Sequence, residues 1–447
     1  MALAINFTNH SGLSSDDVYL TFGVPAGNPD PLNSPNDFNI AYGPSNTPVT
    51  FANKKNMMSE PISLTELGTT GLTVNYAQSV AVYVSYGKKI ESTTASPVFI
   101  GSGIDYNTQF QTFEITMMGQ PGDQGNMTAI NYFTAPMKIE SFAGTSVLET
   151  KSFSKTADKI AEELGALATS AGVLDKGELI RYIGPSSYNS GNPWPSFSPY
   201  LKAMNAATQM THFANQNGFI KNVTTGQKTV PHNIIYRFDL KSTVGSDNSI
   251  SSTGGTVTVT DGTLGTTLGT FSDCDVTIAG SSQSALDQLI YGQAPYTSDL
   301  ITWGSGWAKL KAEMIKEFTV PKKGSPGAGY FNTLQATVIG EITSGFLMGM
   351  VGSDVLPAGK TVKIKDMQSS DWWTLNPIVA FAQVQPNNAY YNTYANAIYQ
   401  GSSNESYSIP YSDRLGTGPL VNTVEFNGSD VTSWTVTLEP PISLASG

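Results

Sequence analysis

The period of the hydrophobic pattern changes twice along this chain, which limits the folds open to it. Up to about residue 145, apolar and polar residues alternate in short runs such as DDVYLTF, SVAVYVSYGKKI, FEITM and PMKIESF, separated by Gly, Pro and Asn turns. Such runs predict β-strands. Strand patterns return from about Thr361, in TVKIKDM, IVAFAQV, SYSIP and VTSWTVTLE. We therefore expect residues 1–149 and 361–447 to form one antiparallel β domain.

Between these ends the pattern becomes helical. Ile160, Leu164, Leu167 and Ala171 recur at helical spacing, which predicts a helix from about Thr156. Similar patterns at residues 198–216, 281–290, 306–318 and 333–350 predict further helices, interrupted by an alternating Ser/Thr/Gly-rich stretch at 241–278. Residues 150–360 thus read as an α/β domain inserted into the β domain. At 447 residues, one very large domain is also open.

Charge and composition exclude several functions. Only 13% of residues are charged and the net charge is −11, so nucleic acid is a poor partner. The most apolar window, Val338–Val351, is 14 residues long and contains Glu341, which predicts a buried helix and no membrane span. Three widely separated histidines predict no metal site, and nucleotide-binding motifs are absent, so we expect no cofactor.

The cues to cellular compartment disagree. Cys274 is the only cysteine, which excludes an intrachain disulfide, whereas low charge and abundant Ser, Thr, Asn and Gly are typical of secreted β proteins. The first residues, MALAINFTNHSG, read directly as strand and turn, so we expect that a signal peptide is absent or already removed. We expect a secreted protein, and the sequence predicts no oligomeric state.

One acidic residue stands out on a predicted strand. In TFEITM, Phe113, Ile115 and Met117 share one face, which puts Glu114 on the other. By itself this pattern also fits a solvated glutamate on an exposed sheet face.

The residues around Glu114 resemble a motif of thaumatin-like proteins and of family 64 of the glycoside hydrolases, the β-1,3-glucanases. In these proteins a strand E-[FY]-T-L is followed, after a Gly-rich turn, by D-x-x-D-[VI]-S-x-[VI]-D-G-[FY]-N-x-P-M. Here EITM is followed by DQGNMTAINYFTAPM, with ungapped spacing from Asp123 to Met137. Family 64 also carries an N-[TV]-S-x-V-D form, which Asn126 to Asn131 follow up to the last residue.

Three further segments agree with this resemblance, and they span most of the chain. INFTNHSGLSSDDVYLTF, AVYVSYGKKI and YNTYANAIYQGSSNESYSIPYSDRLG are similar to family segments in the same order. The resemblance implies a thaumatin-like β-sandwich or barrel domain with an inserted α/β domain and a wide acidic cleft between them. It also implies β-1,3-glucan as the partner, hydrolysed with inversion.

Inverting hydrolysis requires a general acid and a general base. The resemblance gives Glu114 the acid position and places the base at Asn131, an amide that cannot accept a proton from water. Asp123, on an acidic-cleft position, is the nearest candidate for a substitute base. It equally fits a cap of the Gly-rich turn.

Two sets of residues are candidates for substrate binding. Asn126, Thr128, Tyr411 and Asp413 fall on or beside family motif positions, and Trp372 and Trp373 offer rings of the kind on which sugars stack. The sequence therefore predicts either a β-1,3-glucanase or a catalytically inactive glucan-binding, defence- or toxin-like protein.

Overall fold

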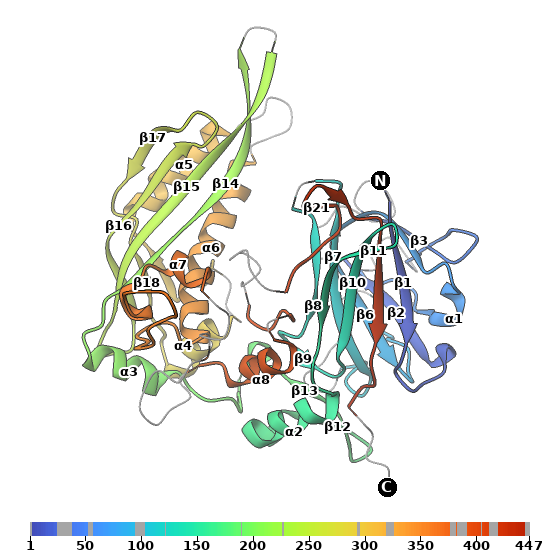
Figure 1. Cartoon of the computed structure of the whole chain (residues 1–447). Coiled ribbons are helices and arrows are strands. Elements are labelled where there is room, and N and C mark those ends of the chain that lie inside the picture. Colours follow the sequence, from blue (N-terminus) through green and yellow to red (C-terminus); the bar gives the residue numbers. More distant parts are fainter. Residues whose placement is uncertain are drawn as a thin grey trace. The chain divides into compact units, whose positions relative to one another are not determined.

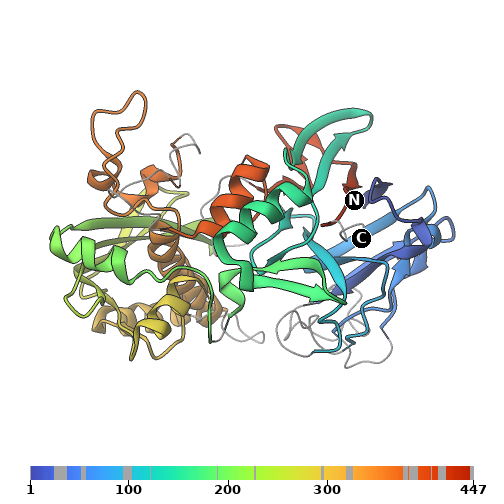
Figure 2. The ribbon, with the colours of Figure 1, turned by 90° about the horizontal axis from the view of Figure 1, so that it is seen from below.

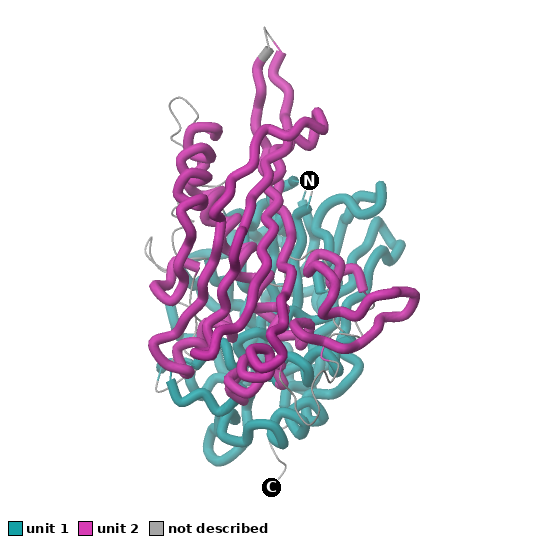
Figure 3. Tube along the Cα trace, turned by 90° about the vertical axis from the view of Figure 1, so that its left-hand side faces the viewer, with its two compact units in different colours: residues 1–194, 394–408, 418–447 teal, residues 195–393, 409–417 magenta. Residues whose placement is uncertain are grey.

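Strands from the two ends of the chain meet in one sheet. Strand β1 (Leu3–Asn9) runs parallel to β23 (Ser433–Leu438), with Ile5 opposite Trp434 and Phe7 opposite Val436. The computed structural model describes residues 2–24, 38–51, 57–93, 103–120, 122–188, 190–225, 228–292, 296–318, 326–375, 381, 391–403, 405–410 and 419–442. It contains two compact units, which Figure 3 colours separately: residues 1–194, 394–408 and 418–447 form unit 1, and residues 195–393 and 409–417 form unit 2.

Unit 1 is built around a sheet whose described part has 12 strands, with the path β11-β10-β23-β1-β6-β7-β8-β20. Apart from β1 and β23, its strands are β2 (Val18–Gly23), β3 (Phe38–Tyr42), β4 (Thr47–Pro48), β5 (Ile62–Ser63), β6 (Leu72–Tyr86), β7 (Gln109–Met117), β8 (Gln124–Thr128), β10 (Met137–Ala143), β11 (Ser146–Ser152) and β20 (Val421–Asn422). Alternate side chains of these strands fill one core, in which Leu20, Val82, Phe113, Ile139 and Trp434 are fully buried.

Smaller elements complete unit 1. Strands β9 (Tyr132–Phe133), β12 (Gly172–Asp175) and β13 (Glu178–Ile183) form a second sheet, and β21 (Glu425–Phe426) pairs with β22 (Ser429–Asp430). The helices are α1 (Leu64–Leu67), α2 (Ala157–Ala168), α8 (Thr393–Ser402) and the 3-10 turns η1 (Ser15–Asp17), η2 (Thr169–Ala171) and η3 (Pro185–Ser187). Helix α2 begins where the sequence predicts, because the Thr156 side chain accepts from the Lys159 N–H. Helix α8 lies beside α2 (Figures 1 and 2).

Unit 2 is a twisted sheet covered by helices. Its strands are β14 (Thr211–Thr225), β15 (Lys228–Val244), β16 (Ile250–Asp261), β17 (Thr266–Phe271), β18 (Val276–Ile278) and β19 (Ile301–Trp303). Its helices are α3 (Ser198–Ala206), α4 (Gln283–Ile290), α5 (Ser305–Glu317), α6 (Gly327–Leu347), α7 (Ser369–Trp372) and the 3-10 turn η4 (Ile364–Asp366). Helix α6 packs against β14, and α5 packs against β17 and α6 (Figure 1).

The predicted fold class, mainly β with an α/β part, is confirmed. Two predicted elements differ. The helix expected over residues 198–216 ends at Ala206 and is followed by β14, and the strand expected at residues 361–367 contains the 3-10 turn η4. None of the helices in the described part of the chain is long and apolar enough to cross a bilayer.

Candidate functional site

Glu114 lies at the middle of three paired strands in unit 1. In β7, Phe113 and Ile115 are buried in the core, and Glu114 is half-buried on the opposite face. Register places Ala81 of β6 on one side of Glu114 and Asn126 of β8 on the other. A carboxylate at this place is held by two neighbouring strands, so its direction is set by the sheet.

A pocket of about 200 Å³ opens beside the Glu114 side chain. It is lined by Ala81, Tyr83, Thr112, Glu114, Thr128, Asn131 and Tyr132. Glu114, Thr128 and Asn131, which the sequence motif associates with one another, therefore line the same pocket. Among the described residues that line this pocket, Glu114 is the only acid.

Hydrogen bonds order the side chains around Glu114. The Asn126 amide donates to Glu114 Oε2 at 3.2 Å, and the Thr128 hydroxyl donates to Asn126 Oδ1 at 2.6 Å. This chain of bonds fixes which end of the Asn126 amide faces the carboxylate. Asn126 is itself 5% exposed, so its contact with Glu114 is shielded from water.

Tyr132 provides a neutral phenol on the pocket wall. Its hydroxyl is hydrogen-bonded to the Thr112 hydroxyl. Burial raises the pKa of Tyr132 well above its ordinary value, and the nearby Tyr83 and Glu114 raise it further. The phenol therefore stays protonated at neutral pH.

Asn131 lies between β8 and β9 and is fixed from a distant part of unit 1. The Ser186 and Ser187 hydroxyls donate to Asn131 Oδ1 at 3.3 and 3.4 Å. The Asn131 carbonyl accepts from the Gly184 N–H at 2.8 Å and from the Ser187 hydroxyl at 2.9 Å. Sequence reasoning did not identify either serine, because no local motif links residues 55 and 56 positions away.

The fold built from these strands has relatives of known structure. A β-1,3-glucanase domain of family 64 from Clostridium beijerinckii superposes with a TM-score of 0.52 at 12% identity, and the match covers 98% of each chain. The chain has the fold of the family 64 β-1,3-glucanases. A laminaripentaose-producing β-1,3-glucanase of this family from Paenibacillus barengoltzii, complexed with laminarihexaose, matches at 11% identity with a TM-score of 0.46, over 98% of this chain and 75% of its own.

Sequence comparisons alone do not reach this fold. No family model and no curated protein matches the sequence. The structural match rests on the arrangement of the strands and helices. The role of each side chain in the site therefore has to be argued from its own contacts.

Asp123, the candidate for a substitute base, is 2% exposed at the turn between β7 and β8. Its Oδ2 accepts from the N–H of Met118 and, at 3.0 Å, from the N–H of Gln120. These are the contacts of an aspartate that caps a turn. Asp123 is not among the residues that line the Glu114 pocket.

The two predicted binding tryptophans are buried side chains of unit 2. Trp372 and Trp373 belong to the core of unit 2, with exposed fractions of 1% and 8%. Their indole N–H groups donate to the Ile364 carbonyl and to Glu341 Oε1, both at 2.9 Å. Tyr411 and Asp413 lie outside the described residues.

Glu341 is a second notable acid, which the sequence indicated only as part of a buried helix. It is fully buried on α6, and its oxygens accept from Asn215 Nδ2 and Trp373 Nε1, each at 2.9 Å. Burial raises the pKa of Glu341 to about 7, although hydrogen bonds from Ser369, Trp373 and Asn215 lower it. The carboxyl group is thus partly protonated at neutral pH.

Proposed function

We propose that the protein recognises β-1,3-glucan at the Glu114 pocket and that Glu114 acts as the general acid in hydrolysis of this polymer. One observation carries the proposal: Glu114, Thr128 and Asn131, which stand at positions of the glucanase motif, line one pocket in a chain with the glucanase fold. The pocket is smaller than the about 300–1,000 Å³ of pockets for drug-sized ligands. It is suited to one segment of a polymer.

The chemistry assigned to Glu114 is proton donation. A protonated carboxyl group beside the glycosidic oxygen gives its proton to that oxygen as the bond to the anomeric carbon breaks. Water attacks the opposite face of the sugar and loses its own proton to a base about 6.5 to 9.5 Å from the acid. Asn131 stands at the family's base position and its amide cannot take that proton.

Turnover in the parent protein is therefore expected to be slow. Glu114, the proposed acid, lines the pocket. The motif position of the base is occupied by Asn131, whose amide is bonded to Ser186 and Ser187. General acid–base catalysis contributes roughly 10²- to 10⁴-fold, so a site without its base loses a factor of this order.

A second candidate function is glucan binding without turnover. It is favoured by the same Asn131, because an amide keeps the ability to donate to and accept from sugar hydroxyls. Both candidates require that glucan binds at the Glu114 pocket. They differ in whether the bond is cleaved.

One experiment separates them: reducing-sugar release from laminarin, measured beside retention on insoluble β-1,3-glucan, for the parent and for Asn131→Asp. We expect retention in both and faster hydrolysis in Asn131→Asp, since the two serine hydroxyls that bond Asn131 can bond a carboxylate equally well. Asn75→Asp, the same change at an exposed position of β6, serves as the control. Retention with no hydrolysis in any variant supports the binder, and loss of retention in the parent contradicts both.

A further inference from the structure

A second pocket lies in unit 2, far larger than the one at Glu114. It has a volume of about 480 Å³, and it lies between the sheet formed by β15, β16 and β17 and helix α5. This volume is within the range of small-molecule sites. Its apolar walls include Ile234, Val259 and Leu310, which come from three different elements.

The pocket exists because one row of the sheet lacks a side chain. Tyr236 of β15 is opposite Val259 of β16, which is opposite Gly269 of β17. In the next row, Val257 is opposite Phe271, whose ring closes the space at one end. Cross-strand partners point to the same face, so a side chain at Gly269 would point into the pocket. Nothing lies within 4 Å of the place where its Cβ would be.

The polar groups of the pocket are acidic. Glu313 and Glu317 are one helical turn apart on α5, and both line it. The lining within the described chain contains no Lys or Arg. The Tyr236 hydroxyl adds a neutral polar group: the residue is 3% exposed, and no other described residue hydrogen-bonds that hydroxyl.

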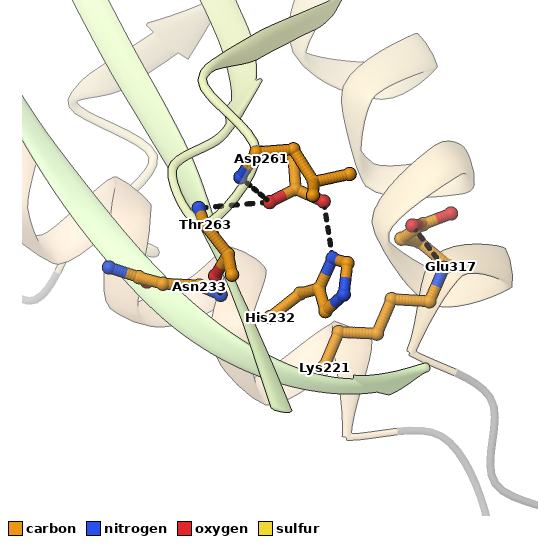
Figure 4. A network of polar contacts seen from close by, with 7 residues as sticks. Lys221, His232, Asn233, Asp261, Thr263 and Glu317 are labelled. Carbon is orange, nitrogen blue, oxygen red and sulfur yellow. Dashed lines mark hydrogen bonds and ion pairs between the residues drawn. The ribbon is translucent and has the colours of Figure 1, made fainter. Parts of the chain in front are cut away.

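Figure 4 shows that the nearby cations are already paired. Lys221 binds Glu317, and His232 Nδ1 lies 2.5 Å from Asp261 Oδ2. Asp261 Oδ1 also accepts from the Thr263 N–H at 3.0 Å. By contrast, the ion pair that Glu313 makes within the described part of the chain is with the exposed Lys316, at 3.8 Å. An exposed pair of this kind is weak, so the Glu313 carboxylate can exchange its partner.

We propose that this pocket binds a small amphiphilic organic cation, with an apolar body and an ammonium group. The apolar body would fill the space left open at Gly269 and make van der Waals contacts with the lining side chains, which the empty pocket does not provide. The ammonium group would donate to Glu313 and Glu317 and to the Tyr236 hydroxyl. A neutral sugar suits the site less well, because it carries no positive charge to pair with the two carboxylates.

Three probes with one apolar body test the charge preference: phenylbutylamine, phenylbutanol and phenylbutyrate, titrated calorimetrically into the full chain. We expect the amine to bind most tightly, the alcohol less tightly and the carboxylate least. Glu313→Gln should weaken binding of the amine by roughly two- to fivefold, which is the size of an exposed charge interaction. Binding of the alcohol should stay unchanged.

Two leucine variants test the location. Gly269→Leu puts a side chain into the pocket and should abolish binding of the amine. Thr270→Leu places the same side chain on the opposite face of β17, where residue 270 is exposed, and should leave binding intact. Equal binding of all three probes overturns the charge assignment. Undiminished binding to Gly269→Leu, or no binding of any probe to the parent, overturns the site.

Discussion

Glu114 in unit 1, which is half-buried, and Glu341 in unit 2, which is fully buried, show how differently a fold can use a carboxyl group. Glu341 is fully buried, and Asn215 and Trp373 donate to its two oxygens. Glu114 accepts from Asn126 and also lines an open pocket. Only Glu114 is placed where a ligand can reach it.

A raised pKa alone does not identify a functional acid in this protein. Perturbed pKa values gather at functional sites, and by that measure alone Glu341, with a pKa of about 7, would be chosen as a functional acid. Its 0% exposure argues against this, because a substrate oxygen cannot approach it without opening the core. Desolvation in a core raises a carboxyl pKa whether or not chemistry occurs there.

The largest expected effect is on turnover. Glu114→Gln removes the proton donor and should lower laminarin hydrolysis by roughly 10²- to 10⁴-fold. Glu341→Gln should leave hydrolysis within about twofold of the parent if its role is structural. Both are measured as initial rates of reducing-sugar release, in the parent and in the Asn131→Asp background.

Binding distinguishes a lost proton donor from a damaged site. Glu114→Gln should still be retained on insoluble glucan, since an amide of the same shape replaces the carboxyl group. A Glu341→Gln variant that folds like the parent but loses turnover would reverse the assignment of the two acids.

The next effect is on stability, through the ionisation of Glu341. Its pKa is about 7 in the folded protein and near 4.5 in the unfolded chain, so the folded state binds more protons between these values. The contribution of Glu341 to the free energy of unfolding should therefore be highest below pH 4.5 and fall by an amount on the order of 3 kcal/mol as the pH rises through 7.

Urea unfolding of the parent and of Glu341→Gln at several pH values isolates this contribution, because all other titrating groups are common to both proteins. The difference between the two unfolding free energies should shift in favour of the glutamine variant as the pH rises. A difference that stays constant from pH 4 to pH 8 would contradict the raised pKa.

The fold could be predicted as far as short-range pattern determines it. Strand alternation at both ends and the Thr156 cap of α2 were readable in the sequence. The helix predicted through residue 216 failed because Ala206, Met210 and Phe213 continue the helical spacing, whereas β14 forms by pairing with β15 over its whole length. This pairing is a tertiary contact that overrides local pattern.

The candidate site also contains some residues that the sequence could place and others that it could not. Glu114 and Thr128 lie on paired strands joined by a short turn, so motif and alternation together place them. Ser186 and Ser187 bond Asn131, and Tyr83 also lines the pocket. These three residues come from segments whose approach depends on the whole sheet. Their place in the site could be recognised only from the structure.

A backbone change tests whether the strand pairing holds Glu114 in place. A Cβ on Gly125 would lie 2.1 Å from the Glu114 carbonyl oxygen and 2.7 Å from the Trp434 ring. Gly125→Ala should therefore destabilise the protein by about 1–3 kcal/mol and lower turnover as well.

Gly269→Ala in unit 2 is the matched control for this change. Its Cβ meets nothing within 4 Å, so stability should change by less than about 0.5 kcal/mol. Thermal and urea unfolding measure both variants. Equal stability of the two would show that the strands near Glu114 shift easily, and the sheet would then not be what orients the acid.

The smallest effect concerns the hydrogen bonds that orient Asn126. With Thr128→Val the Asn126 carbonyl loses the donor that fixes it, and the amide can turn its oxygen toward Glu114. Losing one such bond is worth about 1 kcal/mol, so turnover should fall by roughly fivefold. Thr128→Ser keeps the hydroxyl and should retain most of the rate.

Because Thr128 also lines the pocket, its hydroxyl could instead bind the sugar directly. A double-mutant cycle with Asn126→Ala separates the two roles. If Thr128 acts through Asn126, Thr128→Val has no further effect on the rate once the amide is gone, and the KM for laminarin stays the same. If Thr128→Val lowers the rate by the same factor in the parent and in Asn126→Ala, the Thr128 hydroxyl contacts the substrate directly. Asn126 would then orient Glu114 without a contribution from Thr128.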